Sequence, residues 1–554
     1  MGLIAISSGL DGPELLAQAN ACQGPSTLLP PGLSTPRGAP GGPNTPRGGG
    51  EDRWEYWWVH NFEPTVQLRE HAERFHEASQ GQRPFDPVTD ALRAEVGKIL
   101  VGYLEDKSTS VRAAAARALG RIGSADYVEP LSRVLNDSSQ DVRISAMLSL
   151  GMLENGAGFD RIREVVRSRQ VGQDLVAFGH LALGLLGTEQ SYKVLESHAA
   201  QLLDDSGSSR IASDQNVAVL APTMIGMGLT RNKAAVPFLQ KVFLGDTSLD
   251  ADIRSAVAGA LGKIDDPAVV GILARGLEDR DIEVRRAAAL ALGEILGPDD
   301  VEAQRRLKIL SRSDADPQVK SFALIALGKS RGGDSVRSFL ESSLKERGQA
   351  NVRAYAALAL GLFGDPASSK LLLATLQKEK DSSLRGALSI ALGLLGDSAA
   401  IPTLLELSKD GDPAVRGNAL LAIGLIGDAS VLPKIQPMLT PDLQSEILNH
   451  LTLALGLLGD RASLDKLLIL MQKSASETAK AAVGFAVGRL GDAPLVKPLV
   501  SLAAPGNNDT TRAAAINSLG NLLEARDIPL VSDLSAGINY RTRTLFLANL
   551  LDLL

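Results

Sequence analysis

Basic side chains at a regular spacing are the residues of this sequence with the clearest potential for chemistry. A row of unpaired cations could bind nucleic acid phosphates, with salt-dependent affinity. However, the net charge is −7, and acidic residues stand just upstream of many of the cations, as Asp412 does before Arg416. We therefore predict no nucleic acid partner and a structural ladder of Asp–Arg contacts between adjacent repeats. Its cations are Arg112, Arg143, Arg254, Arg285, Lys320, Arg353, Arg385, Arg416, Lys480 and Arg512.

Histidine and cysteine are too sparse for a metal centre. The chain has six His and one Cys, and only His180, His198 and His450 lie after residue 87. These three stand at scattered positions, whereas a zinc site needs three or four convergent ligands. No combination of nucleophile, base and orienting group can be named either. We predict no catalytic residue, no metal site and no cofactor, and so a protein that is not an enzyme.

A repeated unit built around one glycine organises the chain from residue 87 onward. Leu, Ile or Val precedes this glycine in all thirteen copies, and Ala stands two residues before it in ten. The apolar positions recur with the period of an α-helix, and the alanines let neighbouring helices approach closely. The glycines are Gly120, Gly151, Gly184, Gly226, Gly262, Gly293, Gly328, Gly361, Gly393, Gly424, Gly456, Gly488 and Gly520.

Each copy is predicted to be a pair of helices, because a second amphipathic stretch precedes each glycine-bearing helix, as at residues 401–407. In five copies the phrase Gly-x-x-Gly-Asp follows. We expect its second glycine to end one helix in the left-handed conformation and its Asp to cap the next. One pair cannot bury both of its faces, so stability should come from stacking. The five phrases are Gly361–Asp365, Gly393–Asp397, Gly424–Asp428, Gly456–Asp460 and Gly488–Asp492.

A phrase recurs in the repeats: Asp residues followed by a Val-Arg pair, as at Val111-Arg112 and Val415-Arg416. This phrase resembles that of HEAT repeats, and the short period resembles the HEAT-like repeats of bacterial proteins related to phycobilin lyases. The resemblance covers residues 87–554 and implies an all-α, right-handed superhelix. With helices packed about 8–10 Å apart, an open array would extend on the order of 100 Å. Pro222 is expected to break the second helix of copy four.

Two classes of function follow from this resemblance. The first is a non-enzymatic scaffold that binds a protein or peptide on its concave surface, and the alternative is a lyase-like or chromophore-binding protein. Deoxyhypusine hydroxylases, which are HEAT-like enzymes, hold two irons with His-Glu dipeptides in their repeats. In this chain the only His-Glu is His76-Glu77, outside the repeats.

A track of aliphatic side chains is the candidate partner site. It follows the side of the second helix that lines the inner curve in HEAT-type stacks, and a contiguous exposed apolar patch usually marks an interaction site. Burial of the track between tightly curved helices stays open as the alternative. The leucine track consists of Leu358, Leu362, Ile390, Leu394, Leu421, Leu425, Leu453 and Leu457.

The amino-terminal part differs from the repeats. Residues 1–50 form a Gly- and Pro-rich tail that we expect to be disordered. Its first 22 residues resemble a degenerate secretion signal, so export to the envelope stays open as an alternative to the favoured cytoplasmic location.

Residues 51–86 contain every Trp. Trp54, Trp57, Trp58 and Phe62 share one face of a short helix, which we predict to cap the open end of the array, with contact to a partner or a membrane interface as the alternative. No stretch predicts a transmembrane helix, and the oligomeric state stays open.

Overall fold

The computed structural model describes residues 54–66, 88–168, 170–204, 214–245, 249–346, 350–440, 442–474 and 476–524. These residues form α-helices joined by short turns and 3-10 segments, and they contain no β-strand. The all-α repeat array expected from the sequence is therefore confirmed. The expected tail at residues 1–50 and residues 67–87 lie outside the described residues. None of the described helices is both long enough and apolar enough to cross a lipid bilayer.

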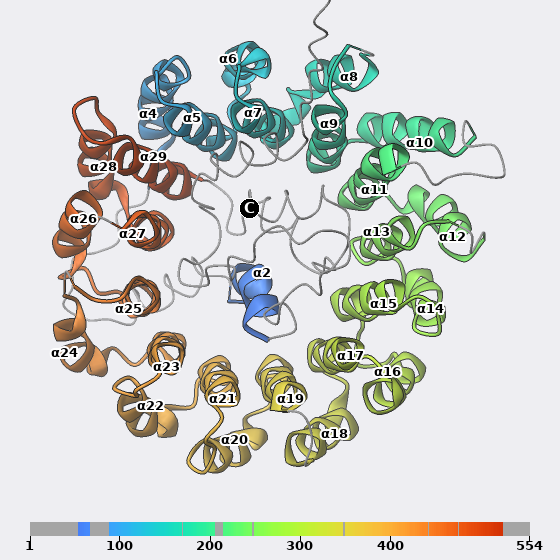
Figure 1. Cartoon of the computed structure of the whole chain (residues 1–554), viewed down its shortest axis with the longest axis vertical. Coiled ribbons are helices and arrows are strands. Elements are labelled where there is room, and N and C mark those ends of the chain that lie inside the picture. Colours follow the sequence, from blue (N-terminus) through green and yellow to red (C-terminus); the bar gives the residue numbers. More distant parts are fainter. Residues whose placement is uncertain are drawn as a thin grey trace, which may run out of the picture.

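Thirteen helix pairs follow one another around the molecule, and in each pair one helix faces outward and one inward (Figure 1). The outer helices are α4 (Asp90–Tyr103), α6 (Val128–Arg133), α8 (Phe159–Arg167), α10 (Glu189–Asp204), α12 (Val236–Leu244), α14 (Pro267–Gly276), α16 (Val301–Ser313), α18 (Gly333–Lys345), α20 (Ser369–Leu376), α22 (Ile401–Leu407), α24 (Leu432–Ile435), α26 (Leu464–Lys473) and α28 (Val496–Ala503). The inner helices are α5 (Thr109–Ile122), α7 (Gln140–Met152), α9 (Gln173–Leu186), α11 (Asp214–Leu229), α13 (Ala251–Leu261), α15 (Ile282–Ile295), α17 (Pro317–Ser330), α19 (Ala350–Phe363), α21 (Ser382–Leu394), α23 (Pro413–Ile426), α25 (Ser445–Leu457), α27 (Glu477–Leu490) and α29 (Asp509–Leu523).

Close contacts between glycine and alanine join successive inner helices. A Cβ atom added to Gly361 would lie 2.7 Å from the Cα atom of Ala391, and one added to Gly393 would lie 2.9 Å from the Cα atom of Ala422. At these distances any side chain at the glycine would collide with the neighbouring backbone. The alanine contacted stands two residues before the repeated glycine of the next copy, which we call the anchor glycine. The repeated glycines and the repeated alanines are therefore the two sides of one contact, the glycine–alanine seam.

The glycine–alanine seam continues from the last copy onto the first and closes the array into a ring (Figure 1). A Cβ atom added to Gly520 in α29 would lie 2.8 Å from the Cα atom of Ala118 in α5. Beside this contact, Arg512 Nη2 donates to Asp106 Oδ2 over 2.5 Å. The expected open array is therefore wrong, because head-to-tail contacts form a ring when the rotation per unit brings the last unit back to the first.

Copy four departs from the expected register. Helix α11 runs through Pro222 without interruption, so the predicted break is wrong. Although proline lacks the N–H group of a helix hydrogen bond, α11 packs along its neighbours α9 and α13. The seam residue is Gly228 rather than Gly226, because a Cβ at Gly228 would lie 2.4 Å from the Cα of Ala260. Gly226 instead takes the place of the alanine and contacts Gly184 of the preceding copy.

The turns between copies follow the expected chemistry in four of the five phrases. Gly364, Gly396, Gly427 and Gly459 have φ between 66° and 81°, in the left-handed region. The carboxylates of the Asp residues after them accept a backbone N–H two residues on, as Asp397 Oδ1 does from Ala399 over 3.0 Å. The fifth prediction is wrong, since Gly491 is extended (φ −84°, ψ 179°) and Asp492 pairs with Arg461 at 2.6 Å rather than capping a helix.

Candidate functional site on the inner face

The Trp-bearing helix α2 (Trp54–Val66) lies inside the ring, against α19 and α21 (Figure 1). Trp54, Trp57, Trp58 and Phe62 are 0–3% exposed, so the predicted apolar face is confirmed as the buried face of the helix. The rings of Trp58 and Phe62 meet edge to face, with centroids 5.3 Å apart. The expected end cap is wrong, because α2 contacts the middle of the array and the ring formed by the described helices closes on itself.

Two consecutive residues of α2 hold the first turn of α21. The indole Nε1 of Trp54 donates to the backbone oxygen of Ser383 over 2.9 Å and lies 3.1 Å from its hydroxyl oxygen. The Ser383 hydroxyl donates in turn to Glu55 Oε1 over 3.1 Å. Glu55 is buried beside the amino-terminal end of α21, where a carboxylate is favoured by the helix dipole. These bonds fix the position of α2 along α21.

A missing side chain provides the space for Trp54. A Cβ atom added to Gly386 in α21 would lie 3.0 Å from Trp54 Cζ2 and 2.7 Å from Asn418 Nδ2 in α23. We call this gap the Gly386 notch. The notch was not predicted, because the leucine track is defined by large side chains and a glycine adds none to the inner face. One signal was present: seven residues before the anchor, glycine occurs only in copies nine and ten, although glycine inside a helix is costly.

The leucine track lies on α19, α21, α23 and α25, the first two of which contact α2. Leu362 and Leu394, the last residues of the track on α19 and α21, are half-buried. The other six side chains are buried: Leu358, Ile390, Leu421, Leu425, Leu453 and Leu457. The track is thus packed in the folded chain, and part of the inner face near it is covered by the aromatic side chains of α2.

The predicted ladder cations contact the neighbouring copy or the end of a neighbouring helix. Arg143 and Arg416 donate to the backbone oxygens of Asp137 and Asp410. Lys480 donates to Thr511 Oγ1 of the next copy over 2.8 Å. Lys320 lies close enough to Asp314 for its charge to lower that carboxyl's pKa. Ion pairs with the next copy around the ring join Arg112 to Asp137, Arg254 to Asp279, Arg285 to Asp314, Arg353 to Glu379, Arg385 to Asp410 and Arg512 to Asp106.

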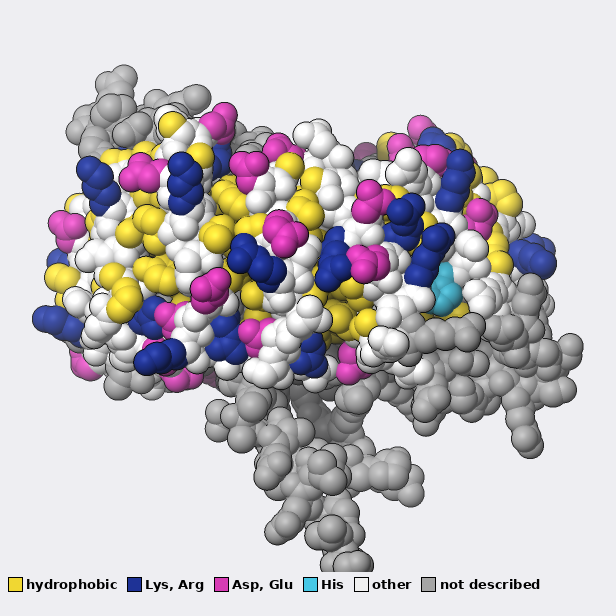
Figure 2. Space-filling model, turned by 90° about the horizontal axis from the view of Figure 1, so that it is seen from above, with side chains coloured by type: hydrophobic (Ala, Val, Ile, Leu, Met, Phe, Trp, Pro, Cys, Tyr) yellow, Lys and Arg dark blue, Asp and Glu magenta, His cyan; other side chains and the backbone are white. Residues whose placement is uncertain are grey.

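Asp314 shows how one rung of the ladder works. Burial by itself would raise the pKa of this carboxyl, but hydrogen bonds from Arg285 and from the Asp316 amide outweigh burial and hold the pKa below its usual range. The same carboxylate therefore joins two copies and holds the backbone of Asp316, the residue that caps the next inner helix. On the face of the molecule drawn in Figure 2, basic and acidic side chains are interspersed rather than gathered by sign.

A contact between His180 and His198 was not predicted from their positions in the sequence. His180 in α9 is fully buried, with Nε2 2.7 Å from His198 Nδ1 and Nδ1 3.0 Å from Thr223 Oγ1. Burial, with a smaller contribution from His198, lowers the pKa of His180 to about 3. Burial also lowers the pKa of His198. The described residues hold no group of three or more His, Cys, Asp or Glu side chains placed to bind a metal ion.

We expect acid to destabilise the fold through His180. An unfolded His titrates near pH 6.5, whereas the buried ring stays neutral to about pH 3, so below about pH 6.5 the unfolded chain binds the extra proton. Stability is therefore present above this window and falls as the pH decreases through it, by about 2 kcal/mol between about pH 7 and about pH 5. Urea unfolding of the wild type and of His180→Gln at both pH values measures the difference. An equal pH dependence in the two proteins would show that His180 contributes nothing.

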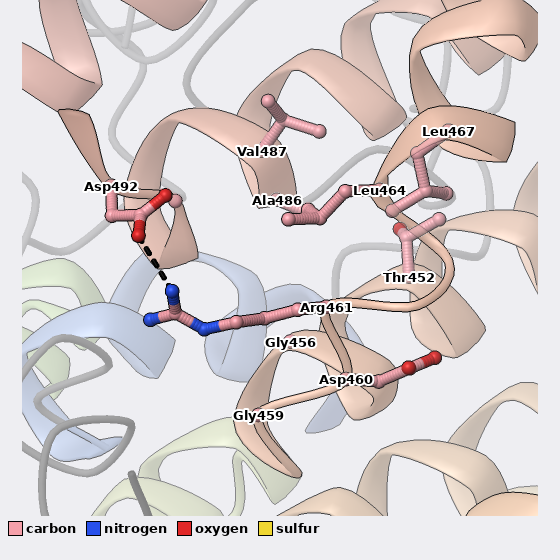
Figure 3. Close-up of a pocket in the computed structure, with 11 residues that line it drawn as sticks. Thr452, Gly456, Gly459, Asp460, Arg461, Leu464, Leu467, Ala486, Val487 and Asp492 are labelled. Carbon is pink, nitrogen blue, oxygen red and sulfur yellow. Dashed lines mark hydrogen bonds and ion pairs between the residues drawn. The ribbon is translucent and has the colours of Figure 1, made fainter. Parts of the chain in front are cut away.

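A pocket between α25, α26 and α27 is lined by Thr452, Asp460, Leu467 and Ala486, among others, and is crossed by the Arg461–Asp492 ion pair (Figure 3). Its accessible volume is about 20 Å³, room for roughly one water molecule. Asp460 accepts hydrogen bonds from Gln436 and Ser463, so its carboxylate is already engaged in packing α24 to α26. The polar residues around this pocket hold neighbouring helices together, and the pocket is too small to contain a chromophore or a substrate.

These features define a class of protein: a closed α-solenoid of short helical repeats, joined by a glycine–alanine seam and an Asp–Arg ladder. The family model for HEAT repeats matches residues 97–172, 208–293, 247–308, 303–393 and 370–456, which together make up more than half of the chain. The chain therefore belongs to the HEAT-repeat family. The finer likeness to phycobilin lyase relatives stays a prediction.

Several solved structures are similar to this chain at low sequence identity. Importin beta, crystallised in ammonium sulfate, is 16% identical with a TM-score of 0.36, over 84% of this chain and 74% of that one. Kap95p, in a structure with RanGDP, is 14% identical with a TM-score of 0.35, over 78% and 66%. Human deoxyhypusine hydroxylase with glycerol is 20% identical with a TM-score of 0.22, over 48% and 95%. The sequence has no match among curated proteins.

Proposed function

We propose that the protein is a non-enzymatic scaffold that binds a protein partner, as a helix or a peptide, on the inner face formed by α19, α21, α23 and α25. The observation that carries this proposal is α2 itself. An amphipathic helix lies against α19 and α21, with an aromatic side chain in the Gly386 notch and hydrogen bonds to Ser383. Laying the apolar face of a helix into a groove is a common mode of peptide recognition.

One observation favours this function over binding of nucleic acid. The ladder cations serve ion pairs and helix ends, and the net charge is −7, so a cationic surface for nucleic acid is not supported. A visible absorption band or a stoichiometric metal in the purified protein would instead favour the lyase-like or chromophore-binding alternative.

Site-specific photo-crosslinking tests the scaffold function. A photoreactive amino acid in place of Leu394, which is half-buried on the inner helix α21, is expected to capture one defined protein in the cells that make this chain. The same amino acid in place of Ile309, which is 51% exposed on the outer helix α16, serves as the matched control. Failure to capture a protein at Leu394, or equal capture at both positions, would contradict binding on the inner face.

A further inference from the structure

The ring closes through contacts that do not involve α2. At the junction of the last and first copies, Gly520 packs on Ala118, Arg512 pairs with Asp106, and Arg93 Nε donates to the Leu523 oxygen over 2.9 Å. The rungs of the Asp–Arg ladder likewise join ring helices to ring helices. Helix α2 is thus an addition to a ring that is complete without it.

The chain between α2 and the ring is long enough for α2 to leave its position. Residues 67–87 separate the end of α2 from the first described residue of the ring. At about 3.3–3.6 Å per residue, a segment of this length spans up to roughly 70 Å when extended. Departure of α2 therefore requires no unfolding of α4 or α5.

The fit of α2 to the inner face is incomplete. Trp54 is buried with its donor satisfied, since its ring lies in the Gly386 notch and its Nε1 donates to Ser383. Trp57, one turn later, is 1% exposed, yet its Nε1 finds no hydrogen-bond partner among the described residues. A buried donor without an acceptor loses its bond to water and weakens binding. A helix with an apolar residue lacking a donor at this position would bind the same face more tightly.

We infer that α2 is a built-in, displaceable occupant of the inner face, and that the partner is an amphipathic helix that places a Trp in the Gly386 notch and a donor-free apolar residue one turn later. This inference rests on the proposed function and names the kind of partner and how the chain limits access to it. Until such a helix arrives, α2 shields the apolar surface of α19 and α21 from water.

Peptides derived from α2 test this inference on the full-length protein. We would use dye-labelled peptides of residues 51–66 carrying either Trp57→Phe or Trp54→Phe, and measure their binding by fluorescence anisotropy. The Trp57→Phe peptide removes the unpaired donor and should bind saturably. The Trp54→Phe peptide loses the bonds to Ser383 and should bind at least about tenfold more weakly. During binding of the first peptide, backbone hydrogen exchange in the protein's own α2 should increase.

Variants of the ring provide the controls. Gly386→Leu fills the notch and should abolish peptide binding, whereas Gly259→Leu, at an inner-helix glycine with nothing within 4 Å of an added Cβ, should leave it unchanged. If circular dichroism shows that Gly386→Leu is unfolded, Ser383→Ala is instead combined with the full-length Trp54→Ala variant, whose own α2 no longer binds Ser383 through an indole. There, loss of the Ser383 hydroxyl should weaken binding of the Trp57→Phe peptide several-fold relative to Trp54→Ala alone.

One result would overturn the inference: neither peptide binds the wild-type chain, and neither binds a full-length Trp54→Ala variant whose own α2 is weakened. Helix α2 would then be a fixed part of the fold. This failure is distinguishable from failure of the scaffold function. Peptide binding without cross-linking of a cellular protein at Leu394 would support a displaceable α2 and contradict the scaffold function. Cross-linking without peptide binding would support the scaffold function and contradict a displaceable α2.

Discussion

Replacing Gly520 with leucine is expected to open the ring. The new side chain would begin 2.8 Å from the Cα and 3.0 Å from the Cβ of Ala118, so α29 and α5 must move apart as whole helices. Overpacking of this kind typically costs about 1–3 kcal/mol. At the other twelve junctions the two copies are consecutive in the chain. Helices α29 and α5 are far apart in sequence and are held together here by non-covalent contacts such as Arg512–Asp106.

Small-angle X-ray scattering measures this opening directly, because an arc has a larger maximum dimension than a ring of the same copies. Gly262→Leu is the matched control: its Cβ would lie 2.9 Å from the Cα of Ala291, a similar collision at a junction where the chain runs on. We expect a larger maximum dimension and faster hydrogen exchange in α5 and α29 for Gly520→Leu alone. Unchanged scattering from Gly520→Leu would show that the closure tolerates separation of the two helices.

The second large effect is expected from breaking one rung of the Asp–Arg ladder. In Arg285→Gln, the carboxylate of Asp314, whose side chain is 6% exposed, loses its bidentate partner. A nearly buried charge left without its hydrogen-bonded counterion destabilises a fold by about 2 kcal/mol or more. Because Asp314 also accepts the Asp316 amide, the loss should spread to the first turn of α17. Arg285 joins copies six and seven, so the effect should be strongest in α15, α16 and α17.

Local hydrogen exchange, together with the urea midpoint, measures this destabilisation. The control is Arg305→Gln, which breaks an ion pair of the same type between Arg305 and Glu302 on the surface of α16, where both side chains are about 60% exposed. Exposed ion pairs contribute little to stability, so this variant should unfold as the wild type does. If both variants behave alike, the rungs contribute no more than ordinary surface ion pairs.

The repeat, the helix pairs and most turns were predictable because each is set by residues close together in sequence. A glycine that must adopt φ near 76°, such as Gly364, and the Asp365 that caps the next helix form a local unit, so the phrase alone predicts the turn. The same phrase at Gly491 gives an extended residue instead. There Asp492 is engaged by Arg461, thirty-one residues earlier in the chain, and no local pattern encodes that competition.

The candidate site was predictable only in part. The aromatic face of α2 and the leucine track were both visible as helical periodicities, but their relation was not, because Trp54 and Ser383 are 329 residues apart and their contact depends on how the ring curves. The Gly386 notch shows the same limit. A glycine in a helix signals that something approaches closely, yet the sequence does not say what approaches.

The sequence by itself determined the unit: two helices, a seam of glycine and alanine, and cations paired with the acids of the next copy, all of which follow from short-range periodicity and side-chain size. Only the tertiary structure decided that thirteen such units close on themselves and that α2 lies within the ring. The physical reason is accumulation: a small rotation between neighbouring copies, too small to be read from any one repeat, adds up around the array until Gly520 contacts Ala118.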